Sequence, residues 1–129
     1  MIMENLTQWS TGRKRSRIIV KRGLESIALQ LNEVALFYTN NRIVFAVDQK
    51  GKRYFVDKSL GEMEEELDKN FFFRVNRQYI LNINFIRGFK VYEKVKLTVD
   101  LNIPELAPGS HIIISQETAP EFKRWMYEA

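Results

Sequence analysis

The sequence contains no cysteine and a single histidine, His111. Without cysteine there is no disulfide, no thiolate metal site and no thiol nucleophile. One histidine is too few for a histidine-rich metal site. The six glycines are scattered singly, so no glycine-rich phosphate loop is present. Because these absences remove the usual catalytic constellations, we expect neither a cofactor nor an enzymatic activity.

Long apolar runs are also missing from the chain. No stretch of about 18 apolar residues exists, so no membrane-spanning helix is expected. Residues 1–12, MIMENLTQWSTG, hold too few apolar side chains for the core of a signal peptide. The expected location is therefore the cytoplasm.

The chain does have enough apolar residues for a core. Its 129 residues are 45% hydrophobic and 12% aromatic, with nine phenylalanines. That composition argues against a largely disordered chain, and the length fits one domain. A net charge of +4 permits contact with a phosphate backbone without requiring it. Composition alone therefore leaves a basic globular domain whose partner is undetermined.

The pattern of the sequence changes near residue 17. Residues 1–16 lack strand or helix periodicity and end in a run of basic residues, so we interpret 1–16 as a basic arm or linker and 17–129 as the domain. Beyond this point short β-branched and aromatic runs alternate with turn signals, which predicts about nine short strands. Asp48-Gln49-Lys50-Gly51 is a clear hairpin signal. Residues 94–99 are expected to form the last long alternating strand.

Two short helices are expected among the strands. Ser59 followed by Glu62 is a capping box, which begins a helix over about 60–68. Thr118 with Glu121 marks the start of a closing helix. The buried face of that second helix would consist of Phe122, Trp125 and Met126. Since strands do not alternate with helices, a doubly wound parallel sheet is not expected, and the fold class is mainly β.

Polar residues gather in the expected turns beside apolar strands. The three groups are Asn40-Asn41-Arg42, Asn76-Arg77-Gln78 and Ser115-Gln116. Arginine can pair with guanine, and asparagine or glutamine with adenine, at base edges in DNA grooves. The same residue types are common in ordinary turns and on surfaces. The pattern alone therefore leaves both interpretations open.

Residues 72–82, FFRVNRQYILN, resemble the signature segment of LytTR-type DNA-binding domains of the LytR/AlgR family of bacterial regulators. Residues 52–56 and the acidic helix that follows are similar to the family's usual lead-in to this segment. Residues 113–116 and 121–125 resemble its closing strand and helix. The resemblance covers about residues 17–127, and several ordered motifs agree.

This resemblance implies an elongated fold of three small, mostly antiparallel sheets with two short helices, whose loops read DNA major grooves. It implies sequence-specific binding of double-stranded DNA at direct-repeat sites, with a second copy on the DNA as a further candidate partner. The chain would be a response-regulator output domain or a stand-alone regulator of transcription. The implied base-reading residues are Arg42, Arg77 and Gln116, and the supporting residues are Asn41, Asn76, Gln78, Asn82 and Ser115.

Two alternatives remain open. The first alternative is a protein-interaction module that keeps the fold but has lost DNA binding. It is suggested by Gln116, which stands where the family often has arginine, and by the lack of an apparent receiver domain. Salt-dependent binding to duplex DNA would distinguish a DNA-binding module from this protein-interaction module. Three tyrosines in strand patterns, Tyr38, Tyr54 and Tyr79, could stack on single-stranded bases or could simply pack in the core.

Overall fold

The computed structural model describes residues 16–104 and 112–128. The expected basic arm over residues 1–16 therefore lies outside the described residues, except for Ser16. His111 also lies outside them. The division into an arm and a domain stays a prediction.

The described residues form ten strands and two α-helices, which confirms the mainly β class. Two 3-10 helices, η1 (Leu31–Glu33) and η2 (Ile83–Phe85), and the α-helices α2 (Leu60–Glu66) and α3 (Ala119–Glu128) accompany the strands. The strands are β1 (Arg17–Arg22), β2 (Glu25–Gln30), β3 (Val34–Asn40), β4 (Ile43–Asp48), β5 (Arg53–Val56), β6 (Phe72–Arg74), β7 (Tyr79–Asn82), β8 (Ile86–Tyr92), β9 (Lys96–Leu101) and β10 (Ile112–Ile114).

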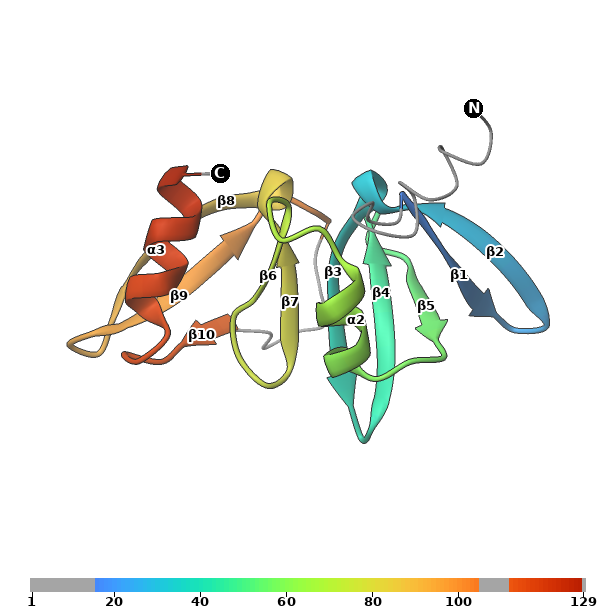
Figure 1. Ribbon diagram of the computed structural model, residues 1–129, viewed down its shortest axis with the longest axis horizontal. Coiled ribbons are helices and arrows are strands. Elements are labelled where there is room, and N and C mark those ends of the chain that lie inside the picture. The colour runs from blue at the N-terminus through green and yellow to red at the C-terminus, as the bar shows by residue number, and fades with distance from the viewer. Residues whose placement is uncertain (1–15, 105–111, 129) are drawn as a thin grey trace, which may run out of the picture.

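The described strands form two sheets, and every pairing between them is antiparallel. The larger sheet has the order β2-β1-β5-β4-β3-β7-β6, and the smaller has the order β10-β9-β8. The expected number of sheets was three. The number is two because the pair Lys21↔Phe55 joins the β1-β2 hairpin to the central strands. In the elongated molecule this hairpin and the small sheet lie at opposite ends (Figure 1).

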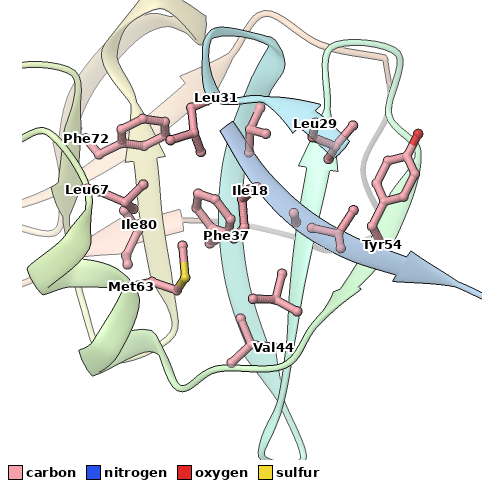
Figure 2. Close-up of a cluster of buried hydrophobic side chains, with 14 of the residues drawn as sticks. Ile18, Leu29, Leu31, Phe37, Val44, Tyr54, Met63, Leu67, Phe72 and Ile80 are labelled. Carbon is pink, nitrogen blue, oxygen red and sulfur yellow. The ribbon is translucent and has the colours of Figure 1, made fainter. Parts of the chain in front are cut away.

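One apolar cluster fills the space between α2, the β1-β2 hairpin and the central strands (Figure 2). Helix α2 begins with the expected capping box: Glu62 N donates to Ser59 Oγ at 3.1 Å, and Ser59 N donates to Glu62 Oε1 at 3.0 Å. The bond from the Ser59 backbone lowers the pKa of the Glu62 carboxyl. The helix ends at Glu66, earlier than expected, because Leu67 turns to an extended conformation and still packs in the cluster.

A second cluster packs the small sheet and α3 against the central strands. Phe122 of α3 is fully buried there, and the Phe73 ring stacks on Trp125 with their centroids 5.1 Å apart. Strand β3 serves both clusters, since Leu36 belongs to the second and Phe37 to the first. This is why β3 reads as an unbroken apolar run instead of alternating.

The last long strand, expected over 94–99, begins two residues later, at Lys96. Lys94 has a φ angle of 52° and lies in the hairpin turn before the strand. The expected hairpin at Asp48–Gly51 is confirmed, with Gly51 at φ 86°.

We expect Leu81→Ala to lower the free energy of unfolding by about 2–5 kcal/mol, because it leaves a cavity at a fully buried position of the second cluster. Leu24→Ala is the matched control: Leu24 is fully exposed in the β1-β2 turn, and its truncation should change stability by less than about 0.5 kcal/mol. Denaturant unfolding measures both. Equal effects would mean that Leu81 does not pack in a core.

Candidate nucleic-acid interface

Three turns that carry the predicted base-reading residues lie along one long edge of the molecule, the lower edge in Figure 1. They connect β3 to β4, β6 to β7, and β10 to α3. We call residues 41–42, 75–78 and 115–118 together the loop edge. Antiparallel pairing explains the arrangement, since alternate turns of such a sheet fall on the same side.

The β3-β4 turn holds Asn41 and Arg42 in the left-handed backbone region, with φ angles of 51° and 68°. This is the geometry of a two-residue hairpin turn, which usually contains glycine or asparagine. Arginine tolerates it only at an energetic cost, because its Cβ crowds the backbone. Both side chains are exposed at the tip of the hairpin.

The β6-β7 turn is built around the half-buried side chain of Asn76. Its Oδ1 accepts hydrogen bonds from the backbone N–H groups of Gln78 at 2.8 Å and Tyr79 at 2.9 Å. Its Nδ2 donates to the carbonyl oxygen of Ile113 in β10 at 2.9 Å. Because these bonds engage both ends of the amide, Asn76 positions the turn and ties it to the small sheet.

Arg74 braces the same turn, a role that the sequence did not reveal. Its Nε donates to the carbonyl oxygen of Asn76 at 3.2 Å, and its Nη2 donates to that of Arg77 at 3.0 Å. Its Nη1 pairs with Glu64 Oε1 of α2 at 3.2 Å. The backbone of Arg77 is thereby fixed, whereas its side chain is exposed and has no partner among the described residues.

In the β10-α3 turn, Ser115 organises the start of α3. Its carbonyl oxygen accepts from Thr118 N at 3.2 Å and from Ala119 N at 2.9 Å, and its hydroxyl lies 3.4 Å from Thr118 N. Gln116 is exposed and has no side-chain partner within residues 16–104 and 112–128. The helix therefore begins without a capping bond from Gln116.

Asn82 does not belong to the loop edge, which corrects its predicted supporting role. It lies at the other end of β7 and is only 1% exposed. Its Nδ2 donates to the Val34 carbonyl oxygen at 2.9 Å, and its Oδ1 accepts from Asn84 N at 2.9 Å. A side chain that is buried and bonded in this way holds β7 against β3 and cannot reach DNA.

The three tyrosines pack within the protein. The Tyr38 ring stacks on Phe45 and on Tyr79, with centroid distances of 5.2 Å and 6.0 Å. Tyr54 is buried, and its hydroxyl donates to Asp48 Oδ2 at 2.9 Å. Burial and this bond raise the pKa of Tyr54. Because these ring faces already contact protein, the structure gives no support to stacking on single-stranded bases.

The antiparallel sheets thus carry exposed loops along one edge, and comparison with known proteins identifies the class of domain. The family model described as the LytTr DNA-binding domain matches residues 25–127. The chain belongs to this family, which consists of DNA-binding domains of regulators and not of enzymes.

A solved structure shares the fold. It is the LytTr DNA-binding domain of a Bacillus cereus protein named as a methyl-accepting/DNA response regulator. The TM-score is 0.74 at 20% sequence identity, covering 87% of this chain and 97% of the other. A search of curated proteins finds no match. Within the described residues no helix is long and apolar enough to cross a membrane, and no cluster of His, Asp or Glu could hold a metal ion.

We expect Asn76→Ala to lower the free energy of unfolding by about 1–3 kcal/mol, because the change leaves half-buried backbone groups without partners. Asn84→Ala is the control and should change stability little. The Asn84 side chain is exposed, and only the backbone of Asn84 donates a hydrogen bond among the described residues, from its N–H to Asn82 Oδ1. Denaturant unfolding measures both variants.

Asn76→Asp separates the turn from the bridge to Ile113. The carboxylate keeps both acceptor bonds but cannot donate to the Ile113 carbonyl oxygen, so this variant should also be destabilised at neutral pH. The difference in the free energy of unfolding between this variant and the parent should become smaller as the pH falls below about 4, because a protonated carboxyl can donate a hydrogen bond again. An unchanged free energy of unfolding for Asn76→Asp at pH 7 would show that the hydrogen bond to Ile113 does not contribute to stability.

Proposed function

We propose that this chain binds specific double-stranded DNA sequences and regulates transcription by placing the loop edge against base edges in the major groove. The observation that carries the proposal is the division of polar groups along this edge. Arg74, Asn76 and Ser115 use their hydrogen bonds to fix turn backbones. The neighbouring long side chains are exposed, namely Arg42, Arg77 and Gln116.

This arrangement suits recognition of a rigid duplex. Four adjacent strands, in the order β4-β3-β7-β6, carry the turns of Arg42 and Arg77. At about 4.8 Å between neighbouring strands, the two turns lie roughly 10 Å apart, which is comparable with the width of a major groove. The fixed backbones lower the entropy lost on binding, since only side chains remain to be ordered.

The exposed side chains have the chemistry for different bases. Arg42 and Arg77 each offer paired donors that match guanine, whereas Gln116 offers one donor and one acceptor that match adenine. Asn41 and Gln78 are exposed beside the two arginines and can support them at bases or phosphates. Asn76 and Ser115 support binding indirectly, through the backbone positions that they fix.

The wider context follows from the same proposal. A DNA-binding regulator would act in the cytoplasm, either as the output domain of a response regulator or as a stand-alone protein. The name of the Bacillus cereus protein supports the first arrangement. Direct-repeat sites would place a second copy of the chain beside the first on the same face of the duplex.

Selection of bound duplexes from a random pool, followed by a salt titration on the selected site, tests the proposal. Affinity should fall at least tenfold between low and moderate salt, because several phosphate contacts release counterions. A single-stranded competitor of the same sequence should displace the duplex poorly. A protein-interaction module on this fold would select no common sequence and would show a flat response to salt.

Arg77→Ala should leave the stability nearly unchanged and cost about 1–3 kcal/mol of discrimination at one base position, the usual range for a bidentate contact. Arg87→Ala is the matched control, because Arg87 is an exposed arginine near the start of β8, at the opposite edge (Figure 1). The measurement is a base-by-base affinity profile at one salt concentration. An equal loss on every sequence would make Arg77 a phosphate contact.

A further inference from the structure

The tip of the β8-β9 hairpin resembles the Arg42 turn in its backbone. Glu93 and Lys94 form this tip, with φ angles of 44° and 52°. Among the described residues, the non-glycine positions with positive φ are these two and the pair Asn41-Arg42. The β3-β4 turn has two residues between the paired Asn40 and Ile43, and the β8-β9 turn has three, residues 93–95, between the paired Tyr92 and Lys96. In both turns the second residue with positive φ is a cation.

This backbone geometry is unfavourable for a lysine. Glycine adopts a left-handed backbone without steric cost, as Gly23 does in the β1-β2 turn with φ 62°. A long cationic side chain held in a strained turn points to a use for that side chain. No core contact explains it, since Lys94 is exposed and belongs to neither apolar cluster.

The hairpin tip lies next to the loop edge. Ile114 of β10 pairs with Leu97 of β9, so continuing the same register places Ser115 beside Lys96 and Gln116 beside Val95. Lys94 is three residues from Leu97, or about 10 Å along the strand direction. Figure 1 likewise shows the β8-β9 tip and the β10-α3 turn on the same side of the molecule.

The charge at the tip is available to a ligand. Lys96 Nζ lies 3.7 Å from Glu93 Oε2, whereas Lys94 has no partner in the part of the chain that the structure describes. A lysine ammonium is a compact charge that binds phosphate well but has no paired donors to distinguish bases. Lys90 and Lys96 are also exposed on this hairpin and reinforce the positive potential.

We infer that Lys94 binds a phosphate of the DNA backbone beside the base pairs contacted by the Gln116 turn, so that the β8-β9 tip extends the DNA contact beyond the loop edge. This inference rests on the proposed function and adds a positioning contact to it. A phosphate contact at this end of the edge would fix how the short β10-α3 turn enters the groove.

Lys94→Gly tests the inference because it should lower the affinity for DNA without lowering the stability of the protein. Glycine relieves the left-handed strain, so the melting temperature should be equal to that of the parent or higher. Affinity for a duplex with a single binding site should fall roughly fivefold to tenfold at 0.1 M salt. The slope of log affinity against log salt should become shallower by about 0.9, the value for one phosphate contact. Base preferences should stay unchanged.

Two control variants isolate the charge at the tip. Glu93→Gly relieves the same kind of strain without removing a cation, so its affinity should be no weaker than that of the parent. Lys50→Ala removes one positive charge from the β4-β5 hairpin at the opposite edge (Figure 1) and should leave the salt slope unchanged. If Lys94→Gly behaves like Lys50→Ala, the inference is wrong.

The remaining outcomes distinguish this inference from the proposed function. If the parent chain binds no duplex, the proposed function itself fails. If Lys94→Gly changes the preferred base at one position, Lys94 reads a base and the phosphate assignment is overturned. Val91 and Val95, which are exposed near the tip, could instead contact a second copy of the chain. A loss that is confined to a duplex with two adjacent sites would show this and would also overturn the inference.

Discussion

Within the loop edge, one side-chain amide, that of Asn76, joins the turn of Arg77 to the small sheet that leads to Gln116. Its bond to the Ile113 carbonyl oxygen crosses from the larger sheet to the smaller one. Apolar packing also holds the sheets together, but the hydrophobic effect is non-directional and sets no fixed register between two loops. A hydrogen bond has a narrow range of lengths and angles, so this bridge sets the relative positions of the turns that carry Arg77 and Gln116.

The polar residues of the loop edge fall into two groups that look alike in sequence. Some fix the backbone, as Asn76 and Ser115 do, and others extend freely from that fixed backbone, as Arg77 and Gln116 do. Arg77 and Gln116 each directly follow a residue with a bonded side chain, Asn76 and Ser115 respectively. Such a turn is rigid and still has a side chain free to bind a ligand, because the conformational entropy of its backbone is lost during folding and not on binding.

Sequence predicted the features that depend on local chemistry. The capping box at Ser59 and the hairpin at Asp48–Gly51 need only neighbouring residues, and both were found. The strand after the β8-β9 turn was expected to begin at Lys94, two residues too early, because Glu93 and Lys94 are not turn-forming residues. Asn76 and Asn82 could not be told apart, since their different roles come from partners 37 and 48 residues away. The joining of the β1-β2 hairpin to the central strands is likewise a long-range contact.

Strand β3 couples the two apolar clusters. Its residues 34–37 are fully buried, with Val34 and Phe37 in the first cluster and Leu36 in the second. Loss of β3 would therefore open both clusters to water. The Arg42 turn, which follows β3, and the Gln116 turn, which leads into α3 and the second cluster, would then lose their support together.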